Sequence, residues 1–325
     1  RVQCRLCSHY CRIAEGERGT CGVRFNQDGT LYTLVYDKIV AANLDPVEKK
    51  PLYHFHPGSL TFSFGTMGCN MGCSFCQNAS ISEPPRRGKE PTGQDVTPEG
   101  LVQAAVDSGA QSIAYTYTEP TIFFELMRDT ARLAHERGLK NIMVSNGFMS
   151  PQCLDALDGL IDAANIDLKA FTEAFYQNQC GARLDPVLKN LKQVKEMGWW
   201  LEVTTLLVTG LNDSAEEVRD IAGFIAGELG AETPWHISRF HPTHRLRDRP
   251  STPLTSLEQA HDAGKEAGLR YVYIGNVPGN DAGHTLCHAC GDMLVNRMGF
   301  TSRNGGLKGG ACKGCGAAMA GVGLP

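Results

Sequence analysis

Thirteen cysteines stand out in this sequence of 325 residues, because their spacing is that of metal ligands. All of them except Cys153 and Cys180 belong to one of three sets. The sets are Cys4, Cys7, Cys11 and Cys21; Cys69, Cys73 and Cys76; and Cys287, Cys290, Cys312 and Cys315. Disulfide scaffolds are usually short secreted chains with paired cysteines, and a set of three cannot pair internally. The sequence therefore predicts thiolate–metal chemistry in a reducing cytoplasm.

The central set, Cys69, Cys73 and Cys76, has the spacing C-x3-C-x2-C and directly follows an apolar run. Three thiolates can bind three irons of a [4Fe-4S] cubane and leave the fourth iron open to a chelating substrate. An open coordination position likewise distinguishes catalytic from structural zinc sites. The alternative interpretation is a zinc loop that lacks a fourth ligand, or a group of buried free cysteines.

The last set forms two C-x2-C pairs separated by a 21-residue spacer, which is the pattern of a zinc ribbon. Two such pairs make a tetrahedral four-sulfur site without strain. Gly291 and Gly316 follow the pairs and allow each backbone turn to curl toward its sulfurs. We expect structural zinc at these four cysteines, with an iron site as the alternative.

The first set has the spacing C-x2-C-x3-C-x9-C. Four sulfurs that occupy every corner suit an auxiliary [4Fe-4S] cluster for electron relay and a structural zinc equally well. The sequence thus predicts an N-terminal metal site and leaves its metal open. His9 lies within this loop, but four cysteines already suffice as ligands.

The middle of the chain must supply the framework for the three-cysteine loop. Short apolar runs alternate with helical segments between about residue 58 and residue 277. The expected strands are 60–64, 113–117, 142–144, 164–168, 201–208, 235–237 and 271–274. Capping residues and early prolines or acids predict helix starts at 97–99, 150–151 and 213–217. Repeated β–α units predict a parallel sheet with its chemistry at the carboxyl ends of the strands.

Composition and charge exclude several classes of protein. Hydrophobic residues make up 42% and charged residues 20%, which is ordinary for a folded chain. Thirty-one basic and 35 acidic side chains give a net charge of −4, so no overall basic field attracts nucleic acid. No apolar run is long enough to span a membrane. We expect a cytoplasmic protein without a nucleic-acid or membrane partner.

The three-cysteine loop resembles the signature of the radical S-adenosylmethionine (SAM) superfamily. The chain is most similar to the PflA-like radical SAM enzymes of the AmmeMemoRadiSam system, which are relatives of pyruvate formate-lyase activating enzyme. The similar segments include 45–52, 115–121, 165–169, 235–242 and 273–279. The resemblance implies an α/β fold, namely a partial (β/α)6 barrel flanked by small cysteine-rich metal-binding segments. The expected domains are an N-terminal metal-binding segment (1–52), the barrel (53–277) and a zinc-ribbon-like segment (278–325).

The same resemblance implies an activity. A radical SAM enzyme cleaves SAM reductively at a [4Fe-4S] cluster to methionine and a 5′-deoxyadenosyl radical, which abstracts hydrogen from a substrate. An external electron donor of the flavodoxin or ferredoxin type is implied, and AMMECR-like and Memo-like proteins are implied as partners. The substrate is not indicated. The alternatives are a glycyl-radical-enzyme activase and, in another class, a non-catalytic metal-stapled scaffold or electron carrier.

Candidate SAM contacts follow the second, third and fourth strands. The resemblance places Glu119 against the methionine ammonium, although the paired glycines of the superfamily are absent here. Asn146 ends the third strand, where a binding role and a plain Asn-Gly turn are both open. Asp167 and Lys169 share one face of the fourth strand. They are interpreted either as SAM contacts or as a structural ion pair.

Later strands supply further candidates. Glu202 and Thr204 share one face of the fifth strand, where they line the ribose of SAM or pair within the core. The segment from 236 to 249 is rich in histidine and arginine. We expect His236, Arg239 and His241, which lie nearest the strand, to contact an anionic substrate or the adenine. A solvated loop is the alternative for the more distant arginines.

Overall fold

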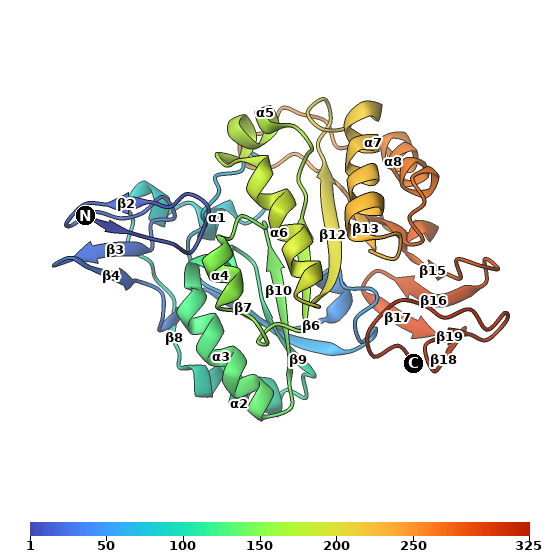
Figure 1. The fold of residues 1–325 in the computed structure, drawn as a ribbon, viewed down its shortest axis with the longest axis horizontal. Helices are drawn as coiled ribbons and strands as arrows, with labels where there is room; N and C mark the ends of the chain where they lie inside the picture. Colours follow the sequence, from blue (N-terminus) through green and yellow to red (C-terminus); the bar gives the residue numbers. More distant parts are fainter.

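The computed structural model describes residues 1–325, and its centre is a sheet of eight strands (Figure 1). Seven of the strands are parallel and coincide with the seven predicted runs. Their bounds are β7 (Leu60–Gly65), β9 (Ser112–Tyr115), β10 (Lys140–Ser145), β11 (Ala163–Asp167), β12 (Trp200–Leu207), β13 (Trp235–Arg239) and β14 (Val272–Gly275). The eighth strand, β6 (Ala41–Pro46), is antiparallel to β7 and forms one edge of the sheet. Because β6 and the opposite edge strand β14 do not pair, the barrel is partial, as expected.

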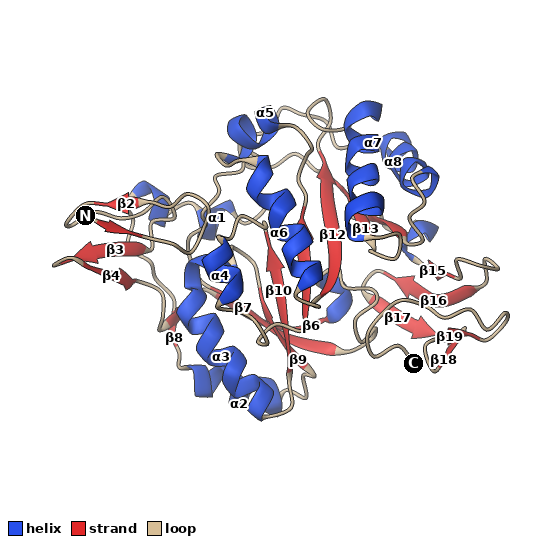
Figure 2. Cartoon of the chain, viewed as in Figure 1, coloured by secondary structure: helices blue, strands red, loops and turns tan.

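Six helices connect successive parallel strands and lie along the outside of the sheet (Figure 2). They are α2 (Pro98–Asp107), α3 (Phe124–Glu136), α4 (Pro151–Asp155), α6 (Leu184–Glu196), α7 (Ala215–Phe224) and α8 (Leu254–Glu266). The side chains of Thr97, Ser150 and Ser214 accept backbone hydrogen bonds at the starts of α2, α4 and α7. These caps confirm the three predicted helix starts. Six β–α units and a seventh parallel strand therefore form the barrel.

Shorter elements lie in the connecting loops. They are the helices α1 (Ala79–Ser82) and α5 (Glu173–Phe175) and the turns η1 (Val47–Lys49), η2 (Pro85–Arg87), η3 (Pro120–Phe123), η4 (Tyr176–Cys180), η5 (Ile225–Leu229) and η6 (Asp281–Gly283). Two of these turns, η4 and η5, are π-helical, and single π-helical turns often occur at functional sites. The turn η4 lies against the three-cysteine loop, as described below.

Both sides of the sheet are packed. On the side of the helices, Phe64, Tyr115 and Trp235 belong to a core of 59 buried residues. Parallel sheets are usually buried on both faces, and the other face here is the interior of the barrel. A separate cluster inside the barrel joins Leu52 and Phe55 to short side chains of the strands. We call residues 47–56, together with 320–322, the floor of the barrel.

Small hairpins make up both ends of the chain. The N-terminal strands are β1 (Val2–Gln3), β2 (Arg12–Ile13), β3 (Arg24–Gln27), β4 (Thr30–Thr33) and β5 (Lys38–Ile39), the last of which pairs with β8 (Gln94–Asp95). The C-terminal strands are β15 (Thr285–Leu286), β16 (Met293–Met298), β17 (Thr301–Asn304), β18 (Leu307–Lys308) and β19 (Ala311–Cys312). The two groups of hairpins lie at opposite ends of the molecule in Figure 1. No helix is both long and apolar enough to cross a membrane.

The ends of the chain are joined to the barrel more closely than the expected domain bounds imply. β6, within the expected segment 1–52, is part of the central sheet. Val322, within the expected segment 278–325, forms a parallel bridge with Phe55 in the floor. The Val322 amide also donates to the His54 carbonyl at 2.8 Å. Residues from both ends therefore complete the barrel.

His54 lies at the centre of this floor and is only 1% exposed. Its Nδ1 is 2.8 Å from the Ala320 carbonyl oxygen, so Nδ1 donates and must carry the proton. Its Nε2 then accepts a hydrogen bond from the Tyr273 hydroxyl at 2.5 Å. Burial lowers the pKa of His54 to about 4, because the charged ring would lose its hydration.

Acid should weaken the fold through this histidine. The unfolded chain protonates His54 near its ordinary pKa of about 6.5, whereas the folded chain does so near 4. The contribution of neutral His54 to the free energy of unfolding is therefore fully present above about pH 6.5. It falls by about 3 kcal/mol as the pH approaches 4. The thermal unfolding midpoint should drop less between about pH 7 and about pH 5 in His54→Gln than in the natural chain. His241→Gln, at an exposed position, should keep the full drop. An equal drop in all three proteins would contradict this role of His54.

Candidate functional site

The three-cysteine loop leaves β7 at the carboxyl edge of the sheet, where the motif predicts it. Three backbone hydrogen bonds hold it against other segments. The Gly68 amide donates to the Ile81 carbonyl at 3.0 Å. The amides of Gly72 and Ser74 donate to the carbonyls of Cys180 and Gln179 in η4, both at 2.8 Å. The π-helical turn therefore aligns the loop and fixes the backbone around its cysteines.

Two sulfur atoms of this loop have polar neighbours. The Met71 amide donates to Cys69 Sγ at 3.4 Å, and the Ser82 hydroxyl lies 3.4 Å from Cys76 Sγ. Burial raises the pKa of the Cys69 thiol well above its usual value, and the nearby Glu119 carboxylate raises it further. A thiolate at this position is therefore costly until a metal cation compensates its charge.

The three sulfurs of the loop do not form a compact group of the kind that surrounds a single metal ion. Sulfur ligands of one tetrahedral zinc lie about 3.8 Å apart, because each Zn–S bond is about 2.3 Å long. The ligand sulfurs of a cubane lie farther apart, at about 6 Å, because each binds a different iron. The three sulfurs of Cys69, Cys73 and Cys76 are not all within 4.8 Å of one another. The buried Asn70 amide nitrogen, Nδ2, has no hydrogen-bond partner in this loop and is free to donate to a bound group.

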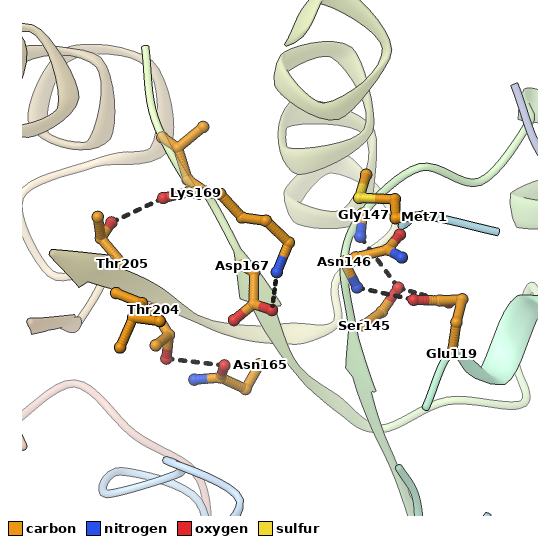
Figure 3. A network of polar contacts seen from close by, with 12 residues as sticks. Met71, Glu119, Ser145, Asn146, Gly147, Asn165, Asp167, Lys169, Thr204 and Thr205 are labelled. Atoms are coloured by element: carbon orange, nitrogen blue, oxygen red, sulfur yellow. Dashed lines mark hydrogen bonds and ion pairs between the residues drawn. The ribbon is translucent and has the colours of Figure 1, made fainter. Parts of the chain in front are cut away.

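The Glu119 carboxylate organises the rim beside this loop (Figure 3). Its Oε1 accepts hydrogen bonds from the Thr121 amide at 3.1 Å, the Thr121 hydroxyl at 2.7 Å and the Ser145 hydroxyl at 2.9 Å. Its Oε2 accepts from the Asn146 amide at 2.8 Å. Glu119 has no exposed surface. Burial raises the pKa of Glu119, and the donors from Thr121 and Asn146 oppose that shift.

Asn146 joins this network to the loop. Its side-chain Nδ2 donates to Asn70 Oδ1 at 2.7 Å and lies 3.8 Å from Cys69 Sγ. Its Oδ1 accepts from the Phe148 amide at 3.0 Å. The Glu119 carboxylate orients Asn146 through this contact. Its Oε2 accepts only this one hydrogen bond from the protein, so the role of Glu119 in holding the SAM ammonium stays a prediction.

Asp167 and Lys169 lie together at the end of β11, as their spacing predicts (Figure 3). Lys169 Nζ is 2.6 Å from Asp167 Oδ2. The Lys169 side chain is 12% exposed and the Asp167 side chain 34% exposed. Burial would lower the pKa of Lys169, but the charge of Asp167 and the thiol of Cys73 raise it well above its usual value. The ion pair therefore places a fixed positive charge beside the loop and a carboxylate that remains partly open.

Three comparisons with known proteins bear on this geometry. Residues 64–225 match the sequence model of the Radical SAM superfamily. The chain is 43% identical to the uncharacterized protein MJ0808 of Methanocaldococcus jannaschii over 97% of this chain and 94% of that protein. The chain belongs to the radical SAM superfamily.

The chain is also similar to one further relative and to one solved structure. The chain is 23% identical to the 4-hydroxyphenylacetate decarboxylase activating enzyme of Clostridioides difficile strain 630, over 47% of each chain. Its fold is similar to a crystal structure of a radical SAM methyltransferase from Sphaerobacter thermophilus, with a TM-score of 0.53 and 18% identity. That similarity covers 74% of this chain and 71% of the methyltransferase and concerns the fold alone.

Glu202 and His236, predicted to line SAM or the substrate, lie elsewhere in this radical SAM barrel. Glu202 is the third residue of β12 and has no exposed surface. Its carboxylate accepts from the amides of Tyr53 and His54, the Trp200 indole and His236 Nε2, at 2.6 to 3.0 Å. Burial alone would raise the pKa of Glu202, but the hydrogen bond from His236 opposes this effect, and the pKa is lowered overall. Both residues thus fix the floor, because they lie near the amino ends of their strands.

Thr204, two residues farther along β12, points into the barrel nearer to the carboxyl edge. Its hydroxyl donates to Asn165 Oδ1 at 2.8 Å (Figure 3). The Asn165 amide donates in turn to the Pro51 carbonyl at 2.8 Å. Thr204 therefore lies between the floor and the Asp167 pair, at the depth where the interior of the barrel remains partly exposed.

Arg239 and His241 are not directed toward the loop. Arg239 lies on the same face of β13 as Trp235 and Ile237, which is the helix side. Its Nε donates to the Thr252 carbonyl at 2.8 Å. His241 is exposed and lies 3.1 Å from the Ser251 hydroxyl. The sequence identified the correct strand end but not the direction of these side chains.

A cavity of about 360 Å³ opens beside Cys76. Its lining includes Glu83 and Arg87 from one side and His244 and Arg247 from the loop after β13. His244 Nε2 is 2.8 Å from Glu83 Oε1, which closes part of the cavity wall. The cavity thus adjoins the last cysteine of the loop.

Cys180 is the site residue that the sequence left unexplained. Its thiol lies beside the Cys73 sulfur, and this neighbour, with Lys169, lowers the pKa of Cys73 to about 7. Such direct contact places Cys180 behind Cys73 rather than at a separate corner of a cubane, whose corners lie about 6 Å apart. Three cysteines of the site therefore remain as candidate ligands at separate positions. The sequence gave no signal for Cys180, because this cysteine stands alone and has no metal-ligand spacing to another cysteine.

The C-terminal cysteines form a compact group. All four sulfurs lie within 4.8 Å of one another, including Cys287 to Cys315 at 3.6 Å and Cys290 to Cys312 at 3.7 Å. The amides of Gly291 and Gly316 donate to the carbonyls of Cys287 and Cys312, both at 2.9 Å. Both glycines have positive φ, at 80° and 76°. The structure thus forms two matching turns around one tetrahedral metal position, with the spacing of a mononuclear site.

Proposed function

We propose that this radical SAM protein binds a [4Fe-4S] cluster at Cys69, Cys73 and Cys76 and uses it to cleave SAM for hydrogen abstraction from a substrate. The observation that carries the proposal is a set of three separated sulfurs, without a fourth independent one, at the carboxyl edge of the barrel. A scaffold or electron carrier normally closes its cluster with four protein ligands. The missing ligand favours an enzyme, because SAM can occupy the open position.

The chain's own residues would bind and orient SAM. A cluster held at the loop would supply the electron that separates SAM into methionine and a 5′-deoxyadenosyl radical. The partly open Asp167 carboxylate is suited to a cationic or hydroxyl group of SAM, and Thr204 lies deeper on the same side. Asn146, held by Glu119, fixes Asn70 beside the first cysteine. Lys169 places a positive charge near the loop, which favours the reduced, more negative state of a bound cluster.

Two candidate reactions could follow the cleavage of SAM. Similarity to an activating enzyme supports a glycyl-radical-enzyme activase as the second candidate, with a protein substrate. The motifs shared with the AmmeMemoRadiSam enzymes favour AMMECR-like and Memo-like proteins as partners instead. Either reaction requires an external electron donor of the flavodoxin or ferredoxin type. The arginines beside the 360 Å³ cavity favour an anionic substrate group.

We further propose that the C-terminal set holds structural zinc. Its sulfur separations of 3.6 and 3.7 Å agree with the edge of about 3.8 Å around one tetrahedral zinc. The site also braces the floor. Arg297, from the hairpin between the two cysteine pairs, donates to the Tyr53 carbonyl at 2.9 Å and lies 4.1 Å from the Tyr53 ring centre.

The test is SAM cleavage under strict anaerobiosis. The reconstituted protein should give a cluster EPR signal that changes when SAM is added. With dithionite as reductant, it should release 5′-deoxyadenosine and methionine even without its substrate, through slow uncoupled turnover. The proposal would be contradicted by protein that has a full cluster but shows no change in its EPR signal with SAM and releases no 5′-deoxyadenosine. Adding AMMECR-like and Memo-like proteins and an anionic small molecule would then distinguish the candidate reactions.

A further inference from the structure

The N-terminal cysteines share the wide spacing of the central loop rather than the compact spacing of the C-terminal set. No three of the sulfurs of Cys4, Cys7, Cys11 and Cys21 lie within 4.8 Å of one another. They nevertheless surround one region, because the Cys4 amide donates to the Cys11 carbonyl at 2.9 Å and the four thiols influence one another electrostatically. Four sulfurs that surround one region without forming a compact group like the C-terminal one suit the four irons of a cubane better than a single zinc.

Hydrogen-bond donors are already directed at these sulfurs. The amides of Leu6, His9 and Val23 lie near the sulfurs of Cys4, Cys7 and Cys21, respectively. Each donor lies two residues after its cysteine, as in the Cys69 to Met71 contact of the central loop. Amides in this position stabilise thiolates bound to a metal.

Arg24 supplies an independent sign of a bound anionic group. Its side chain is only 4% exposed and lies close enough to Cys4 and Cys21 to interact with their charges. Its two terminal nitrogens bind Glu125 and the Ile122 carbonyl. Its Nε has no partner, although a buried donor without one is costly. Four thiolates with their metal carry net negative charge, which would satisfy this donor.

The N-terminal set directly adjoins the three-cysteine loop. A side chain at Gly68 would place its Cβ 3.0 Å from the Cys21 carbonyl oxygen, so the two backbones are in contact one residue before Cys69. His9 Nε2 donates to the Asn70 carbonyl at 2.7 Å. Cys21 faces the loop and is 7% exposed, whereas Cys11, beside Thr20, lies toward solvent. The set thus connects the protein surface with the central loop.

We propose that Cys4, Cys7, Cys11 and Cys21 hold an iron–sulfur cluster that relays electrons from an external donor to the central cluster. The role as relay rests on the proposed function, whereas the identity of the N-terminal group does not. One electron leaves a reduced flavin or iron–sulfur protein, enters near Cys11 and leaves near Cys21. The donor is oxidised by one electron and the central cluster is reduced by one, without transfer of a proton or a bond.

Metal analysis of anaerobically purified protein tests the identity of the group. The whole chain should contain about eight irons and about one zinc. A chain with Cys69, Cys73 and Cys76 changed to Ala should keep about four irons and a cubane Mössbauer spectrum. Two zincs in the whole chain, or no iron in the triple variant, would overturn the proposal even where SAM cleavage succeeds. If the variant does not fold, the iron and zinc content of the whole chain decides the identity of the N-terminal group.

The relay has its own test, in which the electron source is varied. Replacing Cys7 and Cys11 by Ala should slow 5′-deoxyadenosine release with a reduced flavodoxin by more than about tenfold, while release with dithionite, a small reductant, stays near the natural rate. Cys153→Ala removes a buried cysteine near the same set and should change neither rate. An equal loss with both reductants, or no loss with flavodoxin, would overturn the relay. A natural chain that fails to cleave SAM with either reductant would refute the proposed function instead.

Discussion

A chain in which Cys69, Cys73 and Cys76 are all replaced by Ala is expected to release no 5′-deoxyadenosine and to show no SAM-dependent change in its EPR spectrum. The physical reason is that these three cysteines are the proposed ligands of the cluster that binds SAM. The measurement is product formation with dithionite, together with EPR in the presence and absence of SAM. The terminal metal sites should remain loaded, because their ligands lie in separate segments.

Two single substitutions serve as controls for this loss. Cys153→Ala should leave the SAM-dependent signal unchanged, because Cys153 is a buried core residue outside the three-cysteine motif. Cys180→Ala should keep the cluster but change its spectrum, because it removes the thiol beside Cys73. Survival of the SAM-dependent signal in the triple variant would show that SAM binds elsewhere. Loss of the cluster in Cys180→Ala would instead make Cys180 a ligand.

Glu119→Gln is expected to weaken SAM binding by about tenfold to hundredfold while the iron content stays the same. The carboxylate oxygens face donors from Thr121, Ser145 and Asn146. A glutamine has one oxygen and one NH2 group, so in either orientation an N–H group must face another donor. Asn146 should then move, and its contact with Cys69 should be lost.

The spectrum without SAM separates two explanations of this result. If Glu119 acts by positioning Asn146, the reduced cluster of Glu119→Gln should have altered EPR g-values even before SAM is added. If it binds the ammonium of SAM directly, only the SAM-bound spectrum should change. Ser145→Ala removes a single donor and keeps the charge, so it should weaken SAM binding much less. Unchanged SAM affinity in Glu119→Gln would exclude both roles.

The sequence predicted the framework well because local signals and tertiary structure agree there. Alternating apolar runs gave all seven parallel strands, and the side chains of Thr97, Ser150 and Ser214 cap the helices as expected. The motif spacing placed the central loop on the correct edge and paired Asp167 with Lys169. Each of these predictions depends on residues that are close in the sequence. β6 was missed because its residues, AANLDP, lack the apolar alternation of a strand.

The depth of a side chain along a strand could not be predicted in the same way. Glu202 and Thr204 share one face, yet Glu202 binds the floor while Thr204 lies nearer the rim. The difference depends on residues 53 and 54, which enter the barrel from a distant part of the chain. The partner of Cys73 was hidden for the same reason, because Cys180 lies more than a hundred residues away in η4.

The floor of the barrel has a consequence for biosynthesis. Residues 320–322 pair with His54 and Phe55, and they leave the ribosome only after every strand of the barrel. During translation, the aromatic side chains of Tyr53, Phe55 and Tyr271 therefore remain uncovered on the nascent chain. Exposed apolar surface of this kind is aggregation-prone and attracts chaperones. The floor is complete only after these residues have been synthesised, so we expect stable folding of the barrel to follow translation of the C-terminal hairpins.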